Sequence, residues 1–167
     1  MGPATRWAQQ ARADAFLGFF GPSQPKITDF HADWYLVAAD LSALPVAEAT
    51  LEAMPADAKG VAVFEVPSKE DIRDLPAPLA MKVHWLIQDD VHAPSTAQID
   101  FIRSMDWPAG AVQTCIAGES SVIRALRDLL HNERRVPKKD TYISGYWKIG
   151  LVEDEHQKMK RAEAAAA

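Results

Sequence analysis

Two short polar stretches of this sequence could bind a charged or planar ligand, and each follows an apolar run. In "AADLSALP", residues 42 and 43 begin a predicted helix, and the unpaired N–H groups of a helix start bind phosphate. The Ser42 hydroxyl could add a bond, although it would serve equally well as a helix cap. In "AGESS", Gly118 permits a tight turn before Glu119. A carboxylate at Glu119 repels phosphate but accepts hydrogen bonds from a ribose or an amide; otherwise it only complements the helix dipole.

The stretch "SGYW" ends the last predicted strand on two large aromatic residues. Neighbouring side chains of a strand point to opposite faces, so Tyr146 and Trp147 cannot enter the same core. If Trp147 is not a core residue, its ring is available to stack on a planar ligand. No GxGxxG pattern accompanies these stretches, so the usual glycine fingerprint of a dinucleotide site is missing.

Apolar stretches of strand length alternate with helical patterns and must position these residues. Strands are expected at 33–40, 60–67, 81–88, 111–118 and 141–147, and helices at 41–55, 95–105 and 120–135. Strands with little alternation, bracketed by helices, indicate a parallel sheet covered on both faces. We therefore predict an α/β fold with a doubly wound five-stranded parallel sheet. Ligands of such folds bind at the carboxyl ends of the strands, near the point where the strand order reverses, so the stretches above should meet at one rim.

The composition is that of an ordinary globular domain and excludes several functional classes. The 167 residues are 48% apolar and 25% charged, with a net charge of −5. This acidic balance does not suit a non-specific nucleic-acid binder. The single Cys115 lies in an apolar run, which indicates a buried thiol, and the histidines lack metal-binding spacing. No stretch reaches the roughly 18 apolar residues of a membrane span, so we expect a cytoplasmic protein.

The two ends of the chain are expected to differ from the central domain, which we place at residues 31–150. Thr5 is predicted to cap a short helix, and "AFLGFFGP" (15–22) to form a strand that Gly21 and Pro22 end. Residues 151–167 are interpreted as a charged helical tail that is solvated or faces a partner.

Six stretches occur in the order "GPATRWA", "FLGFFGP", "ADWYLVAADLSALPV", "CIAGESSVIRALRDLL", "SGYWKIG" and "VEDEH". Their order and spacing resemble the C-terminal, nicotinamide-nucleotide-binding half of the siderophore-interacting proteins, a family with a ferredoxin-reductase-like architecture. Each stretch alone is weak evidence, but all of them in register make the resemblance specific. It implies a reductase that takes electrons from NAD(P)H, or from ferredoxin in some relatives, passes them through FAD and reduces the Fe(III) of a ferric siderophore so that iron is released.

The resemblance also implies roles for individual residues. Asp40 belongs to the family's first nucleotide loop, and Thr5 to a turn that lies against the FAD pyrophosphate. Trp147 and its neighbour match the terminal aromatic pair beside the flavin and nicotinamide site. We expect Tyr146 to pack toward the helical cover and Trp147 to border the redox site. The matching cofactor-binding positions are Thr5, Asp40, Ser42, Ala43, Gly118, Glu119, Tyr146 and Trp147.

The sequence departs from the family pattern at its start. Met1 directly precedes "GPAT", so the flavin-binding barrel and its "R-x-Y-[ST]" motif do not occur in these residues. We expect residues 1–30 to be the end of that barrel with a linker, and the chain alone not to hold FAD. It is expected to be a fragment, a product of a late-assigned start, or a domain that works with a separate flavin-binding partner. The partners that we consider are a flavin-binding domain and a second copy of the chain in a homo-oligomer. The missing barrel, together with Ala39 in place of a usual glycine, favours an alternative: a non-enzymatic nucleotide-binding or partner-docking module.

The charges that would select the ligands are less clearly placed. "GPSQPK" stands where many relatives have "GPRG", so an arginine credited with attracting anionic ferric siderophores is missing. Lys26 and Lys148 could replace its charge, or they are solvated surface residues. The choice between NADH and NADPH stays open, because "FEVPSK" offers both Glu65 and Lys69 near the end of the second strand.

Overall fold

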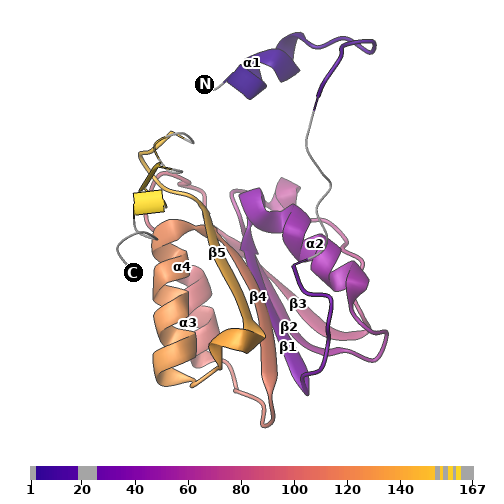
Figure 1. Ribbon diagram of the computed structural model, residues 1–167, viewed down its shortest axis with the longest axis vertical. Helices are drawn as coiled ribbons and strands as arrows, with labels where there is room; N and C mark the ends of the chain where they lie inside the picture. Colours follow the sequence, from indigo (N-terminus) through magenta and orange to yellow (C-terminus); the bar gives the residue numbers. More distant parts are fainter. Residues whose placement is uncertain (1–2, 19–25, 153–154, 156–157, 160, 163–167) are drawn as a thin grey trace. The chain divides into compact units, whose positions relative to one another are not determined.

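The computed structural model describes residues 3–18, 26–152, 155, 158–159 and 161–162 (Figure 1). The chain divides into two compact units, Pro25–Leu151 and a smaller one made of Met1–Gln24 with Val152–Ala167. None of the helices in the described ranges is long and apolar enough to cross a membrane.

The smaller unit contains helix α1 (Pro3–Gln10). The helix begins at Pro3, so the prediction that Thr5 caps it is wrong. Proline suits a helix start because the N–H that it lacks would have no partner there. The strand predicted at 15–22 is also wrong for residues 15–18, which are irregular; residues 19–22 lie outside the described residues. A strand needs a neighbour to accept its backbone hydrogen bonds, and the described part of this unit contains no other strand.

The larger unit is built on the predicted five-stranded parallel sheet (Figure 1). Its strand order is β3-β2-β1-β4-β5, and every neighbouring pair is parallel. The order reverses between β1 and β4, which places the topological switch point at the carboxyl ends of these strands. The strands are β1 (Trp34–Asp40), β2 (Lys59–Val66), β3 (Ala80–Ile87), β4 (Val112–Glu119) and β5 (Thr141–Trp147).

Helices cover both faces of the sheet, as predicted for a doubly wound fold. Helix α2 (Leu44–Ala53) packs on one face, where Leu44 and Leu51 share a buried cluster with Phe64 of β2. On the other face lie α3 (Ala97–Ser104) and α4 (Ser120–Asp128), and their apolar residues share a second cluster with β1, β2 and β4. The central strand β4 is buried along its whole length, because it has strands on either side and helices above and below.

Short helical turns join these elements and change two of the predicted helices. The helix predicted at 41–55 is a 3-10 turn, η1 (Leu41–Ala43), followed by α2. Pro45 separates them because it has no N–H to donate to the carbonyl four residues earlier. The helix predicted at 120–135 is α4 followed by a π-turn, η3 (Leu129–Glu133). The remaining 3-10 turns are η2 (Lys69–Asp71) and η4 (Lys138–Asp140).

Candidate functional site

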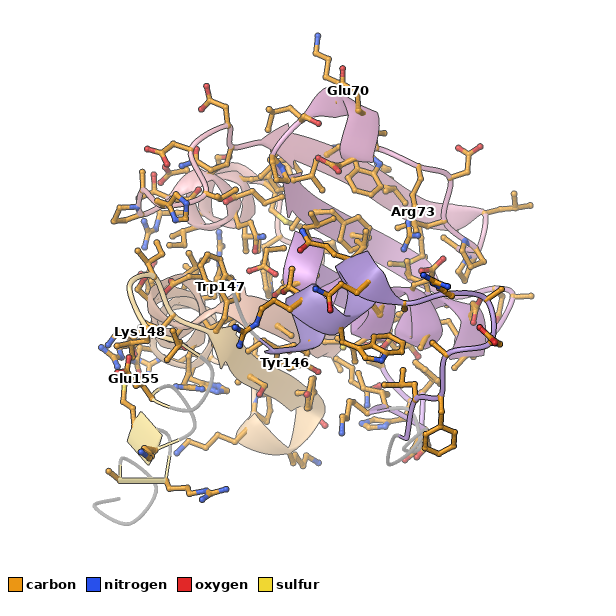
Figure 2. All side chains as sticks on the ribbon, turned by 90° about the horizontal axis from the view of Figure 1, so that it is seen from above. Glu70, Arg73, Tyr146, Trp147, Lys148 and Glu155 are labelled. Atoms are coloured by element: carbon orange, nitrogen blue, oxygen red, sulfur yellow. The ribbon has the colours of Figure 1, made fainter. Side chains whose placement is uncertain are left out.

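A cleft of about 300 Å³ lies at the switch point, where β1, β2, β4 and β5 end. Figure 2 views the sheet from this end, with Trp147 near the middle of the picture. Most of the cleft wall is apolar, and its charged side chains are all carboxylates: Asp40, Glu65 and Glu119. Apolar pockets with a few convergent polar groups are typical small-molecule sites. The apolar and aromatic residues of the wall include Leu41, Val66, Val91, Ile123, Trp147 and Ile149.

Asp40 ties the end of β1 to the end of β5. Its Oδ1 atom accepts hydrogen bonds from the backbone N–H of Ser42 at 3.0 Å and of Ala43 at 3.2 Å, and so caps η1. The same oxygen accepts the Ser42 hydroxyl at 2.6 Å. Its Oδ2 atom accepts the indole N–H of Trp147 at 2.7 Å. The cap is therefore Asp40 rather than Ser42, and the amides proposed to bind phosphate are already occupied.

Gly118 acts in this site by allowing close approach and not by forming a turn, because it lies within β4, which continues to Glu119. A Cβ atom at this position would lie 2.7 Å from Oδ2 of Asp40 and 2.9 Å from its Cγ. The missing side chain thus makes room for the carboxylate that holds Trp147.

Glu119 caps the next helix in the same manner. Its Oε2 atom accepts hydrogen bonds from the backbone N–H of Ser121 at 2.6 Å and of Val122 at 3.1 Å, and also from the Ser121 hydroxyl. Its Oε1 atom accepts the backbone N–H of Ile149 at 3.3 Å. Burial opposes the charged form, but these hydrogen bonds outweigh it and lower the pKa of the Glu119 carboxyl. The carboxylate is therefore charged and fully engaged at the start of α4.

Glu65 is a site residue that our site prediction omitted. It pairs with Asp40 in the sheet register, and its Oε2 atom accepts the Ser95 hydroxyl at 2.9 Å. Burial and the nearby Asp40 raise the pKa of Glu65, while hydrogen bonds from Ser95 and the backbone N–H of Gln98 counter them. The sequence had offered Glu65, together with Lys69, only as a residue that could distinguish NADH from NADPH, because both lie near the end of the second strand.

The two aromatic residues of the last strand have different surroundings, and the prediction that Trp147 borders a redox site stays a prediction. Tyr146 packs against the buried cluster beneath α2, and its hydroxyl lies 3.2 Å from that of Tyr142. Burial raises the pKa of the Tyr146 hydroxyl. Trp147 lines the cleft, and its backbone carbonyl accepts the Ser120 hydroxyl at 2.8 Å. Both residues are labelled in Figure 2.

The remaining predicted site residues do not line this cleft. Ala43 is fully buried and contributes only its backbone N–H, which Asp40 occupies. Lys26 lines a separate cavity beside His31, and the half-buried Lys148 is not part of the cleft wall. Thr5 is an exposed residue of α1 in the smaller unit.

The apolar wall and the carboxylates of this cleft suit a base and a ribose of a nicotinamide nucleotide better than they suit its pyrophosphate. The apolar wall and the Trp147 ring suit a planar base, and a fixed carboxylate suits a ribose hydroxyl. The pyrophosphate would meet no cation among the residues that line the cleft, and capping carboxylates hold amides of η1 and α4. None of the His, Cys, Asp and Glu side chains of the described residues cluster in a group that could hold a metal ion.

Comparisons with known proteins agree on one family. The sequence profile described as "Siderophore-interacting protein" matches residues 32–150. The chain is 36% identical to the ferric vibriobactin reductase ViuB of Vibrio cholerae over 156 residues, which cover 92% of this chain and 57% of that protein. It is also 36% identical to an uncharacterized protein of Mycobacterium tuberculosis, covering 99% of this chain and 62% of that protein. The chain thus spans about three fifths of the length of these relatives.

Solved structures show the same fold. The siderophore-interacting protein SipS from Aeromonas hydrophila superposes with a TM-score of 0.82 at 27% identity, over 100% of this chain and 65% of that one. The siderophore-interacting protein from Acinetobacter baumannii has a TM-score of 0.88 at 22% identity, over 99% of this chain and 66% of that one. The family profile covers most of the chain, and the relatives, the strand order and the predicted motifs are consistent with it. The chain belongs to the siderophore-interacting protein family.

Proposed function

We propose that residues 25–151 are the nicotinamide-nucleotide-binding domain of a flavin-dependent ferric-siderophore reductase. The observation that carries the proposal is the position of Trp147, whose ring is fixed by Asp40 on the wall of an apolar cleft at the switch point of the sheet. Switch points are where doubly wound sheets bind nucleotides, and an indole face stacks well on a planar ring. Membership of the siderophore-interacting family supports the ferric-siderophore substrate.

The residues of the cleft would bind and orient the nucleotide, and they would not exchange protons with it. The Trp147 ring would stack on a planar base while the Asp40 carboxylate holds the indole in place. Glu65 would accept a hydrogen bond from a ribose hydroxyl. Glu119, which holds the backbone of Ile149, keeps the chain that follows β5 at the cleft wall. A bound NAD(P)H would supply the hydride, and the apolar wall of the cleft would exclude water from the bound nucleotide.

The ferric siderophore is the proposed substrate, and Fe(III) is reduced to Fe(II) within the chelate. Neither Lys26 nor Lys148 lines the nucleotide cleft. Both stay predicted contacts of an anionic chelate. We propose that the FAD is supplied by a separate flavin-binding partner or domain. Electron transfer from NAD(P)H through FAD to Fe(III) therefore depends on this flavin-binding partner, which can be added in an assay.

The test combines binding and turnover. Calorimetric titration with NADH, NADPH and ADP-ribose measures binding to the chain itself. Consumption of NAD(P)H is then followed with a ferric catecholate chelate and an FAD-loaded flavin-binding partner, with the same mixture lacking this chain as the background. We expect binding of at least one nucleotide and consumption above that background. A chain that binds none of these ligands would refute the proposal.

A second candidate is a non-enzymatic nucleotide-binding or partner-docking module. The observation that favours it is the capping of η1 and α4 by Asp40 and Glu119, which leaves fewer free amides for a pyrophosphate than nucleotide-binding turns usually offer. Nucleotide binding without any consumption, even when a flavoprotein partner is supplied, would favour the non-enzymatic module over the reductase.

A further inference from the structure

Glu65 occupies the position that distinguishes the two nicotinamide nucleotides in doubly wound folds. An acidic side chain near the end of the second strand accepts a hydrogen bond from the free ribose 2′-hydroxyl of NADH, whereas a nearby cation accommodates the 2′-phosphate of NADPH. Glu65 is the next-to-last residue of β2, pairs with Asp40 at the switch point and lines the cleft. We propose that Glu65 makes this cleft selective for NADH over NADPH, an inference that rests on the proposed function of the cleft.

The carboxylate of Glu65 is held in place rather than free to swing out of the cleft. The Ser95 hydroxyl donates to its Oε2 atom at 2.9 Å, and Ser95 also accepts the backbone N–H of Ala97 at 3.2 Å. The backbone N–H of Gln98 also donates to the carboxylate. Gln98 is itself only 3% exposed, and its side-chain amide donates to the Ala39 carbonyl at 3.1 Å. The start of α3 therefore fixes this acceptor in the cleft.

The sequence left Lys69 as the competing candidate, and the structure places it outside the cleft. Lys69 is exposed in η2 and does not line the cleft wall. Arg73 is paired with Glu48 at 2.6 Å. In Figure 2, Glu70 and Arg73 both lie well away from Trp147. None of the described residues that line the cleft carries a positive charge.

The rest of the cleft adds to the selection against a 2′-phosphate. Asp40 and Glu119 place further negative charge on the same rim, and both are bound to backbone N–H groups of their own turns. A phosphate dianion beside Glu65 would meet like charge, and none of the described residues that line the cleft is a cation that could offset it. A hydroxyl at the same place would instead donate a hydrogen bond to the carboxylate. The difference corresponds to a selectivity of at least about 30-fold at a partly buried site.

Calorimetric titration of the full chain with NADH and with NADPH tests the inference without any need for turnover. We expect the Kd for NADH to be at least about 30-fold lower than that for NADPH. Glu65→Gln removes the charge and keeps the shape, so it should tighten NADPH binding about 10-fold. The ratio of the Kd for NADPH to the Kd for NADH should fall by the same factor. Glu70→Gln is the matched control, because it removes the same charge from an exposed residue that does not line the cleft, and it should leave the ratio unchanged.

The outcomes separate this inference from the proposed function. Equal affinity of the wild-type chain for both nucleotides, or a preference for NADPH, would overturn the role of Glu65 and leave the nucleotide site standing. An unchanged ratio in Glu65→Gln would do the same. Binding of neither nucleotide would overturn both proposals. If Glu65→Gln does not fold, Ser95→Ala keeps the charge but releases the carboxylate, and a ratio that does not fall would count against the inference.

Discussion

The hydrogen bond between Asp40 and Trp147 gives the most direct test of how the cleft is built. Asp40→Asn keeps an oxygen that can cap η1, because asparagine and aspartate cap helices about equally well. It also places an amide group where Oδ2 accepts the indole N–H at 2.7 Å, so that a donor faces a donor. A hydrogen bond to a charged group contributes about 1.5–3 kcal/mol to stability. Because Asp40 and Trp147 are only half-buried, we expect a loss of about 2 kcal/mol.

A double-mutant cycle isolates this bond. The free energy of unfolding in urea is measured for the wild type, Asp40→Asn, Trp147→Phe and the double variant. Phenylalanine keeps an aromatic wall but has no N–H to donate, so the double variant should lose little more than either single variant. We expect a coupling energy of about 1.5–2 kcal/mol between Asp40 and Trp147.

Ser42→Ala is the matched control for the cycle. Its hydroxyl donates to Oδ1 of the same carboxylate, and Trp147 binds the other oxygen. Ser42→Ala should therefore show a coupling with Trp147→Phe of less than about 0.5 kcal/mol. A coupling that small between Asp40 and Trp147 would refute the reasoning, because the carboxylate would then not be what fixes the ring.

Further predictions concern the glycine, the other carboxylates and the thiol. Gly118→Ala should cost about 2 kcal/mol in urea unfolding, because the added Cβ would lie 2.7 Å from Oδ2 of Asp40; an unchanged midpoint would contradict this. The folded-state pKa of Glu119 is lowered, so its stabilising contribution is complete above the ordinary value of 4.5 and is lost as the pH falls through the folded value. Glu119→Gln should therefore be less stable than the wild type near neutral pH, and the gap should narrow in acid. The folded-state pKa of Glu65 is raised, so its contribution is complete below 4.5 and is lost as the pH rises through the folded value. Glu65→Gln should consequently gain stability relative to the wild type as the pH rises to neutral. A loss of stability relative to the wild type over that range would show that the pKa of Glu65 is not raised. Burial raises the pKa of Cys115 to about 11, so an alkylating reagent should modify the native thiol at least about 100-fold more slowly than the urea-unfolded one.

Much of the fold could be predicted because local pattern and tertiary structure agree. Each strand of the sheet is a short apolar run, and β1 and β4 lack alternation because both of their faces are covered. The start of α2 was misplaced because Pro45 interrupts the hydrogen bonding of a segment whose apolar spacing looks continuous. The apolar residues at 15–18 resembled a strand, but propensity alone supplies no partner for its backbone.

The site was harder to predict because its key contacts join residues that are distant in the sequence. Asp40 and Trp147 are 107 residues apart, and they meet only because β1, β4 and β5 are consecutive strands of the sheet. The sequence indicated which loops converge but not how each carboxylate is used. Whether Ser42 or Asp40 caps η1 is decided by backbone angles, and both residue types suit the position.

The carboxylates at the strand ends occupy the helix starts that an anionic ligand would otherwise use. Asp40, Glu65 and Glu119 lie at the carboxyl ends of β1, β2 and β4. Each accepts hydrogen bonds from backbone N–H groups where a helical segment begins. In glycine-rich nucleotide sites those N–H groups and the helix dipole are left for the ligand phosphates. Here the protein's own carboxylates satisfy them, so the larger unit can complete these helix starts without a ligand. A nucleotide would then owe its affinity mainly to ring stacking and ribose contacts. Its binding should therefore depend only weakly on salt, because few phosphate charges would be neutralised in the cleft.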